Sequence, residues 1–524
     1  MNDAALEELE PILEHQPLPA DVIKNVVSGT SALGIGVVLE RAFGFLSNIL
    51  AARLGGASTF GAYSLAISTA NNISTYAAGG IGSTAIRFSG EYSRGTRYYT
   101  TLAKVLALIA FLSAFLAATV LWLGASPLAR LVQKPDIVPV LRWAAFSAAG
   151  IIFLECARGF FVGQRRLKAV VLLSGFVGIG MISVLPIASH FGPVAMICGQ
   201  SFVILGAVLV CIALYKPLEL SSPVSIETPA PFVPMLKRVW SYGLMQLSGL
   251  VGLNAAGWWL TSLVAKGDPT MVQMSYFAVA HQFRNVVALV PSLLTEGSFS
   301  EMANANAADA KTPDNVMAMC TYVTTLICLM AAGAAIIVAP WMLLLIYGKA
   351  YTAAATTTAL ALATALVHMG SWAAAQRLSV LSIRLSGIIN AIWAVFVGVT
   401  ATVFLLRSSD AAKGAAVYLA AHLLSAVLLL VALKSKGNLP TGMTTVFSWG
   451  TFSVLGLALL SIGRHHFASA QLPLTAGSVV WWIVAVVTMI QMGKRRNWLP
   501  SRALFERFLN KLPLIAKLLP AARI

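Results

Sequence analysis

Long runs of apolar residues alternate with short polar segments along almost the whole chain. A membrane-spanning α-helix needs about 20 apolar residues, and fourteen runs reach that length between charged residues, proline or glycine. We therefore predict fourteen membrane helices, near 28–52, 59–86, 102–124, 137–157, 169–188, 193–215, 239–265, 272–295, 316–346, 352–376, 386–406, 414–433, 444–463 and 475–493.

The longest polar connection divides these helices into groups. It contains five prolines and is typical of a linker between two units of six helices. The expected organisation is a cytoplasmic N-terminal tail over 1–24, an N-lobe over 25–216, a cytoplasmic linker over 217–237, a C-lobe over 238–433, two additional helices within 434–493 and a basic amphipathic cytoplasmic tail over 494–524.

The two lobes resemble each other at short stretches. Residues 62–66 in the second span are similar to 276–280 in the eighth. A spacing of seven between two arginines follows both the fourth and the tenth span, at Arg158 and Arg165 and at Arg377 and Arg384. Because six is an even number of helices, both lobes begin on the same side, which predicts a parallel repeat.

Composition supports this interpretation and excludes an ordinary water-soluble enzyme. The chain is 58% hydrophobic and 10% charged, whereas soluble domains carry roughly 25% charged residues. The five cysteines lie inside apolar runs and show no metal or disulfide spacing. The pattern favours an all-α polytopic membrane protein with about fourteen transmembrane helices.

The formal charge of +17 is explained by the sidedness of the basic residues. With the N-terminus inside, 25 of the 36 Lys and Arg residues fall on inner loops and tails, nine on outer ones and two within spans. This bias predicts an inner (cytoplasmic) membrane protein with both termini cytoplasmic. The expected partner of the basic tail is anionic inner-leaflet lipid rather than nucleic acid, with glycosyltransferases or a polymerase as further candidate partners.

A family resemblance is visible in residues 39–55, 60–63 and 158–167. In the first of these stretches Arg41 precedes Gly44-Phe45, and the stretch ends with Arg53-Leu54-Gly55. The three stretches are similar to polysaccharide flippases of the multidrug, oligosaccharidyl-lipid and polysaccharide exporter superfamily. The resemblance implies two six-helix lobes around a central cavity. It also implies transport of a polyprenyl-diphosphate-linked oligosaccharide by alternating access, for O-antigen, lipopolysaccharide or exopolysaccharide biosynthesis.

Three other functions fit parts of the same pattern. Lipid II flippases of the superfamily typically carry an Arg-Asp pair where this chain has Ser47-Asn48, so O-antigen or exopolysaccharide export is favoured. A cation-coupled multidrug exporter of the same superfamily remains an alternative. A membrane glycosyltransferase or polymerase is disfavoured because the outer loops are too short to hold catalytic carboxylates.

Arginines within spans are the candidate diphosphate ligands, since a guanidinium pairs bidentately with phosphate and is always charged. Arg41 lies within the first span and Arg284 within the eighth, three residues after His281. Those three side chains are expected to line the cavity. Glu40 is a weaker candidate for a coupling-ion site, because adjacent residues on a helix do not face each other.

Uncharged polar residues within spans are the candidate sugar ligands: Asn71, Asn72, Gln246 and Asn254. The expected cytoplasmic mouth carries Arg87, Arg94 and Arg97. His368 and His422 are interpreted as isolated, packed hydrogen-bonding groups. No metal site, cofactor or phosphate-binding lysine motif is expected.

Overall fold

The computed structural model describes residues 20–92, 96–215, 231–248, 251–305, 311–408, 410–467, 470–496 and 498. Within these ranges the chain forms fifteen α-helices, two 3-10 helices and no strand, which confirms the all-helical prediction. The elements are α2 (Ala20–Ala78), α3 (Ile81–Glu91), α4 (Arg97–Leu131), η1 (Pro135–Ile137), α5 (Val138–Gly163), α6 (Leu167–Ser189), α7 (Pro193–Tyr215), α8 (Phe232–Ser248), α9 (Val251–Lys266), α10 (Val272–Ala305), α11 (Lys311–Ile346), η2 (Lys349–Ala354), α12 (Ala355–Leu381), α13 (Ile383–Leu405), α14 (Ala411–Ser435), α15 (Met443–His466) and α16 (Gln471–Arg495).

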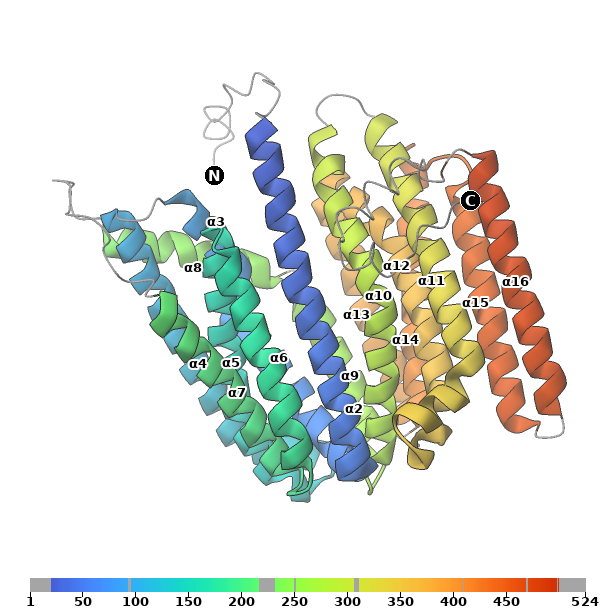
Figure 1. Ribbon diagram of the computed structural model, residues 1–524, viewed down its shortest axis with the longest axis horizontal. Coiled ribbons are helices and arrows are strands. Elements are labelled where there is room, and N and C mark those ends of the chain that lie inside the picture. Colours follow the sequence, from blue (N-terminus) through green and yellow to red (C-terminus); the bar gives the residue numbers. More distant parts are fainter. Residues whose placement is uncertain are drawn as a thin grey trace, which may run out of the picture.

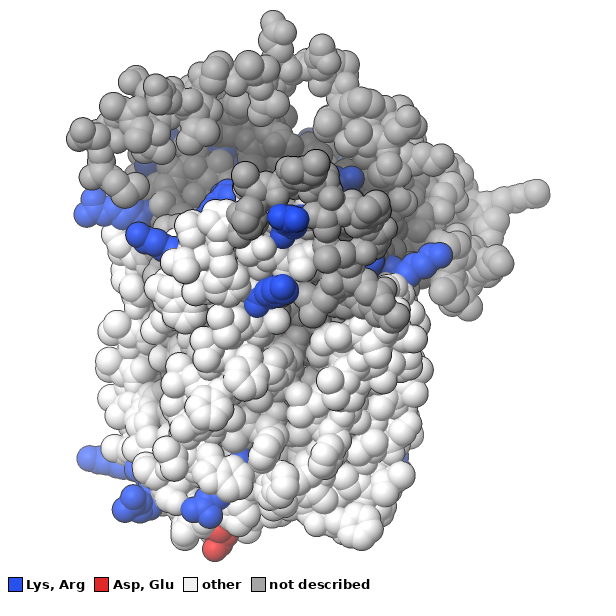
Figure 2. Space-filling model, turned by 90° about the vertical axis from the view of Figure 1, so that its left-hand side faces the viewer, with Lys and Arg blue, Asp and Glu red and all other residues white. Residues whose placement is uncertain are grey.

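Eleven described helices, α4–α7 and α10–α16, are long and apolar enough to cross a membrane. Of the other three predicted spans, the first falls on α2, the second on the rest of α2 and the start of α3, and the seventh on the pair α8 and α9. Figure 2 shows one face of the molecule, on which the described Lys and Arg side chains lie toward the two ends, with an uncharged belt between them. Such a belt is the surface that a hydrocarbon phase requires.

The chain reverses within α2. Gly56 has φ 79° and ψ 167°, a conformation that favours glycine, and it separates two helical segments. We call the end of the molecule that carries Gly56 the outer end, and the end where α2 begins the inner end, following the predicted topology. Both predicted spans of α2 therefore meet at the outer end.

Two groups of helices stand side by side, with the first part of α2 between them (Figure 1). We call α2–α7 the N-lobe and α9–α14 the C-lobe. In the N-lobe α2 packs on α6 and α4 on α5, and in the C-lobe α12 packs on α10, α11 and α14. The lobes meet chiefly where α2 packs against α9 and α10. Helices α15 and α16 lie at the far edge of the C-lobe, against α11.

The seventh predicted span corresponds to two described helices that pack on different parts of the molecule. The sequence predicts one helix over 239–265, and the structure describes α8 as far as Ser248 and α9 from Val251. Helix α8 packs on α3 and α4 of the N-lobe, although α9 packs on α13 of the C-lobe. The approach of α8 is close, because a Cβ on Gly243 would lie 2.9 Å from the carbonyl oxygen of Gly79.

The attachment of α15 to the C-lobe depends on a proline. Pro340 lies inside α11 and supplies no N–H for the carbonyl of Ile336. The buried guanidinium of Arg464 on α15 donates to the Ile336 carbonyl at 3.0 Å and to the Ile337 carbonyl at 2.8 Å. A charged side chain thus satisfies the backbone that the proline leaves open.

We expect Arg464→Met to lower the free energy of unfolding by about 1–3 kcal/mol, the usual cost of a buried polar group that loses its charged partner. Thermal unfolding of the purified protein in detergent would measure this as a lower midpoint. Arg130→Met, at an exposed position, is the matched control. Equal midpoints for the two variants would contradict the role assigned to Arg464.

Candidate substrate cavity

A cavity of about 470 Å³ lies between the lobes, lined by α2, α9 and α10 with Tyr418 of α14. None of its lining residues is Asp, Glu, Lys or Arg. The polar lining consists of amides, hydroxyls and one imidazole, at Asn48, Asn71, Asn72, Asn254, Gln282, Asn285, Ser64, Ser68, Thr75, Thr261 and His281. Trp258 and Phe277 add aromatic surface. Hydrogen-bonding amides beside aromatic rings suit a neutral polyhydroxylated ligand.

The structure brings together four of the residues that the sequence nominated. Asn71 and Asn72 from α2 face Asn254 from α9 and His281 from α10 across the cavity. Gln246 belongs to α8, and its side chain lies outside the described residues.

Three further amides were missed: Asn48, Gln282 and Asn285. A helical-face argument could have found one of them. Asn285 follows His281 by four residues on the same helix, and side chains four residues apart are neighbours. The lining of α10 was therefore partly visible in the sequence.

Arg41 is exposed and lies seven residues before Asn48 on an unbroken part of α2. Seven residues are two helical turns, so Arg41 and Asn48 share a face. Phe45 lies between them on that face and contacts Phe283 of α10, with ring centroids 5.6 Å apart. Arg41 is thus on the side of α2 that faces the C-lobe, two turns closer to the inner end than the cavity.

Arg284 does not line the cavity but lies one layer behind it, with a side chain only 9% exposed. Its two terminal nitrogens contact Nδ1 of His281 at 3.3 Å and Nδ1 of His368 at 3.2 Å. Its guanidinium carbon also lies 4.8 Å from the ring centroid of Tyr418. His281 and Tyr418 both line the cavity, so they separate Arg284 from it.

His368 and His422 are not isolated, contrary to the interpretation from the sequence. Their ring centroids are 4.5 Å apart, and the ring of His422 also lies 4.8 Å from that of Tyr418. With Arg284 and His281 they form one cluster, which we call the Arg–His cluster: His281, Arg284, His368, Tyr418 and His422.

Glu40 has a partner within the N-lobe. Arg158 of α5 donates to its carboxylate at 2.6 Å, and Ser174 of α6 donates at 2.9 Å. Arg158 also pairs with Glu155 at 3.2 Å. These contacts join α2, α5 and α6, so Glu40 has a structural role in the N-lobe. A coupling-ion role for Glu40 stays a prediction.

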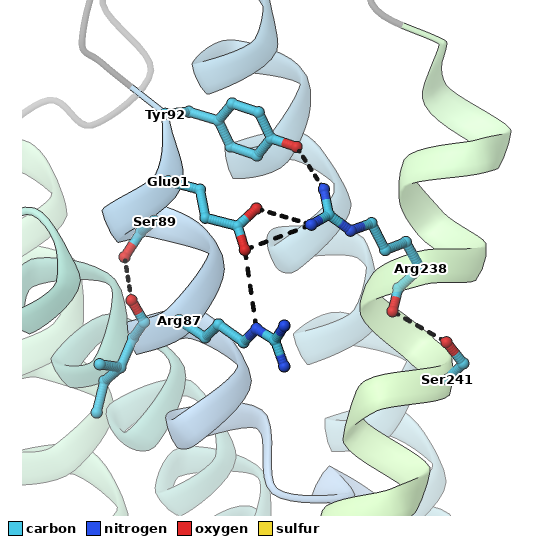
Figure 3. A network of polar contacts seen from close by, with 7 residues as sticks. Arg87, Ser89, Glu91, Tyr92, Arg238 and Ser241 are labelled. Carbon is cyan, nitrogen blue, oxygen red and sulfur yellow. Dashed lines mark hydrogen bonds and ion pairs between the residues drawn. The ribbon is translucent and has the colours of Figure 1, made fainter. Parts of the chain in front are cut away.

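At the inner end, Arg87 takes part in a polar network between α3 and α8 (Figure 3). Glu91 of α3 pairs with Arg87 at 3.7 Å and with Arg238 of α8 at 3.1 Å. Arg238 also donates to the hydroxyl of Tyr92 at 3.1 Å, and the Arg87 guanidinium lies 4.5 Å from the ring centroid of Tyr242. The network holds α8 on α3.

Of the other two residues proposed for the cytoplasmic mouth, only Arg97 lies within the described residues. Arg97 begins α4 at the same end of the molecule. Arg94 lies outside the described residues. Arg87 and Arg238 thus both pair with Glu91, and the cytoplasmic mouth stays a prediction.

The outer end is held closed by contacts between the lobes. Lys134, between α4 and α5, donates to the backbone carbonyl of Asp268, between α9 and α10. Arg53 donates to the carbonyl of Leu345 at 3.1 Å. A Cβ on Gly61 of α2 would lie 2.0 Å from the carbonyl oxygen of Met271, so the two backbones approach closely here.

Asp268 is ionised in this contact. Burial on its own raises the pKa of the carboxyl, but hydrogen bonds from Thr270 and the Gln273 amide, with the charge of Lys134, outweigh it and lower the pKa. Burial lowers the pKa of Lys134, against the attraction of Asp268. Lys134 and the Asp268 carboxyl attract each other, so the closure at the outer end includes an attraction between opposite charges.

Comparison with known proteins agrees with this architecture. Residues 32–187 match the MatE family model. No curated protein sequence matches the chain significantly.

Solved structures share the fold at low sequence identity. A structure of the lipid II flippase MurJ in an inward closed conformation aligns over 88% of this chain and 99% of its own, with 13% identity and a TM-score of 0.64. An inward-facing multidrug resistance MATE family transporter of the MOP superfamily aligns over 82% of this chain and 98% of its own, with 16% identity and a TM-score of 0.61. The fold is therefore that of the MOP-superfamily transporters.

Proposed function

We propose that this protein is a flippase that moves a polyprenyl-diphosphate-linked oligosaccharide from the inner to the outer leaflet of the inner membrane, for surface polysaccharide biosynthesis. The observation that carries the proposal is the lining of the cavity, which is rich in amides and hydroxyls and has no carboxylate, lysine or arginine. Sugar hydroxyls both donate and accept hydrogen bonds, and amide side chains offer both functions.

The diphosphate requires positive charge beside the sugar site. Arg41 lies on the same face of α2 as the cavity residue Asn48, toward the inner end, and Arg284 lies behind the cavity wall. A lipid-linked sugar that enters from the inner leaflet would place its diphosphate near Arg41 and its sugars among the amides. The closed outer end corresponds to the state that accepts substrate from the cytoplasm.

The two alternatives within the superfamily differ in their support. Lipid II is also a polyprenyl-diphosphate-linked sugar, and the alignment with the MurJ structure over 88% of the chain favours it as the second candidate. A multidrug exporter for cationic compounds has less support, because such ligands are commonly held by carboxylates and the lining contains none.

Binding of defined lipids to the protein in nanodiscs tests the proposal. We expect undecaprenyl-diphosphate-linked N-acetylglucosamine to bind more tightly than undecaprenyl diphosphate. Asn71→Ala and Asn254→Ala should each weaken the affinity for the sugar-linked lipid about tenfold, the effect of one or two lost hydrogen bonds. Native mass spectrometry would measure both affinities.

Asn390→Ala is the matched control, since Asn390 lies on α13 and does not line the cavity. Lipid II and the lipophilic cation ethidium would be measured in parallel. Preference for lipid II would select the second candidate. Tight binding of ethidium, together with no binding of either sugar-linked lipid, would contradict the flippase proposal.

A further inference from the structure

The Arg–His cluster contains buried polar atoms that have no partner. The Nε of Arg284 and the Nε2 of His281 and of His422 are buried without a hydrogen bond, and Arg284 and His422 are each only 9% exposed. Unpaired buried polar groups are costly in a packed lobe. Their concentration in one cluster behind the cavity wall therefore indicates a ligand or a second state that satisfies them.

The cluster also holds an uncompensated positive charge. The cluster's side chains come from three helices: His281 and Arg284 from α10, His368 from α12, and Tyr418 and His422 from α14. Trp393 of α13 packs against His422. Among the described residues, no Asp or Glu forms an ion pair or hydrogen bond with any of them. The permanent cation of Arg284 is thus surrounded only by imidazoles and aromatic rings.

The contacts of Arg284 fix where the protons of two imidazoles are. A guanidinium can only donate, so Nδ1 of His281 and Nδ1 of His368 are both acceptors and carry no proton. Each of these neutral rings carries its single proton on Nε2. A second proton has to bind at Nδ1, the atom that Arg284 occupies.

We propose that the Arg–His cluster is a proton-accepting site that is coupled to the substrate's diphosphate, an inference that rests on the proposed function. When the diphosphate moves from Arg41 into the cavity beside His281, it draws the Arg284 guanidinium away from the two imidazoles. The freed Nδ1 of His281 or His368 then takes up one proton from the inner aqueous phase, and that ring becomes an imidazolium. The anionic diphosphate gains a second counter-charge while it is surrounded by the apolar lobes.

Linkage makes the coupling reciprocal. If anion binding increases proton binding, a lower pH must tighten anion binding by the same free energy. One linked proton corresponds to an affinity that rises by up to about tenfold for each pH unit of acidification. A purely structural cluster would give no such dependence beyond the titration of the ligand itself.

Calorimetry with farnesyl diphosphate, a water-soluble prenyl diphosphate, tests the coupling on the full-length protein in nanodiscs. Titrations in two buffers of different ionisation enthalpy give the number of protons taken up per ligand. We expect the wild-type protein to take up about one proton more than the double variant His281→Gln/His368→Gln, with the slope of affinity against pH reduced to match in that variant. The same ligand is used throughout, so its own titration cancels in the comparison.

His190→Gln is the matched control, because His190 is exposed at the end of α6, and it should behave as wild type. Arg284→Gln provides an independent variant that leaves the imidazoles in place, and it should lose ligand-linked proton uptake because both Nδ1 atoms are already free. Binding with equal proton uptake in wild type and all cluster variants would contradict the coupling alone. No binding of farnesyl diphosphate by the wild-type protein would contradict the flippase proposal as well.

Discussion

Replacing Arg41 by Ala is expected to abolish export of the lipid-linked oligosaccharide while the protein still reaches the membrane. Arg41 is exposed on the face of α2 that leads to the cavity, and none of the described acidic residues forms an ion pair with it. Losing a bidentate charged contact to a diphosphate costs about 2–3 kcal/mol, which corresponds to a 30- to 150-fold weaker affinity. Surface polysaccharide in cells, and membrane levels of the protein by immunoblot, would measure the two effects.

Two variants separate charge from geometry at this position. Arg41→Lys keeps the charge but loses the planar pair of donors, so partial export is expected. Arg130→Ala removes an exposed arginine near the outer end and should leave export intact. Normal surface polysaccharide in Arg41→Ala would exclude Arg41 from the mechanism.

A side chain at Gly61 is expected to prevent the outer end from closing. The Cβ of Gly61→Ala would lie 2.0 Å from the Met271 carbonyl oxygen, and a clash with backbone cannot be relieved by a rotamer change. Either the two lobes separate there or the helices shift, so the population moves away from the closed outer end. Transport should fall by at least about tenfold, because the state that loads from the inside becomes rare.

Cysteine labelling would report this change directly. In a background without the five native cysteines, Ser68→Cys places a thiol in the cavity. A membrane-impermeant maleimide added outside should label that thiol faster when Gly61→Ala is present. Gly44→Ala on the same helix is the control, since nothing lies within 4 Å of its Cβ. Identical labelling rates in both backgrounds would show that the outer end tolerates the side chain.

The helices were predictable because a bilayer imposes one length on every span. Each of the fourteen apolar runs corresponds to helix in the structure, and the asparagines at 71, 72 and 254 line the cavity as their polarity suggested. The packing of α8 on the N-lobe and of α9 on the C-lobe was not predictable. On α8, Arg238 contacts Glu91, which lies more than 140 residues earlier in the chain, and the ring of Tyr242 contacts Arg87.

Partners that are distant in the chain explain the other gaps. Glu40 pairs with Arg158, 118 residues away, and Arg284 contacts His368, 84 residues away. A sequence pattern shows which side chains share a helix face, as for His281 and Arg284, but not which helix lies opposite. His368 and His422 therefore looked isolated until the packing of α10, α12 and α14 brought them together.

The placement of α8 has a consequence for how the molecule could be divided. A chain cut within residues 217–230 would leave α8 covalently joined to the C-terminal fragment, although its ion pair and ring contacts are with α3 of the N-terminal fragment. Helix α8 would then act as an exchanged element, like the arm of a domain-swapped dimer. The two fragments, expressed together, should reassemble through it into a working carrier without a peptide bond between them.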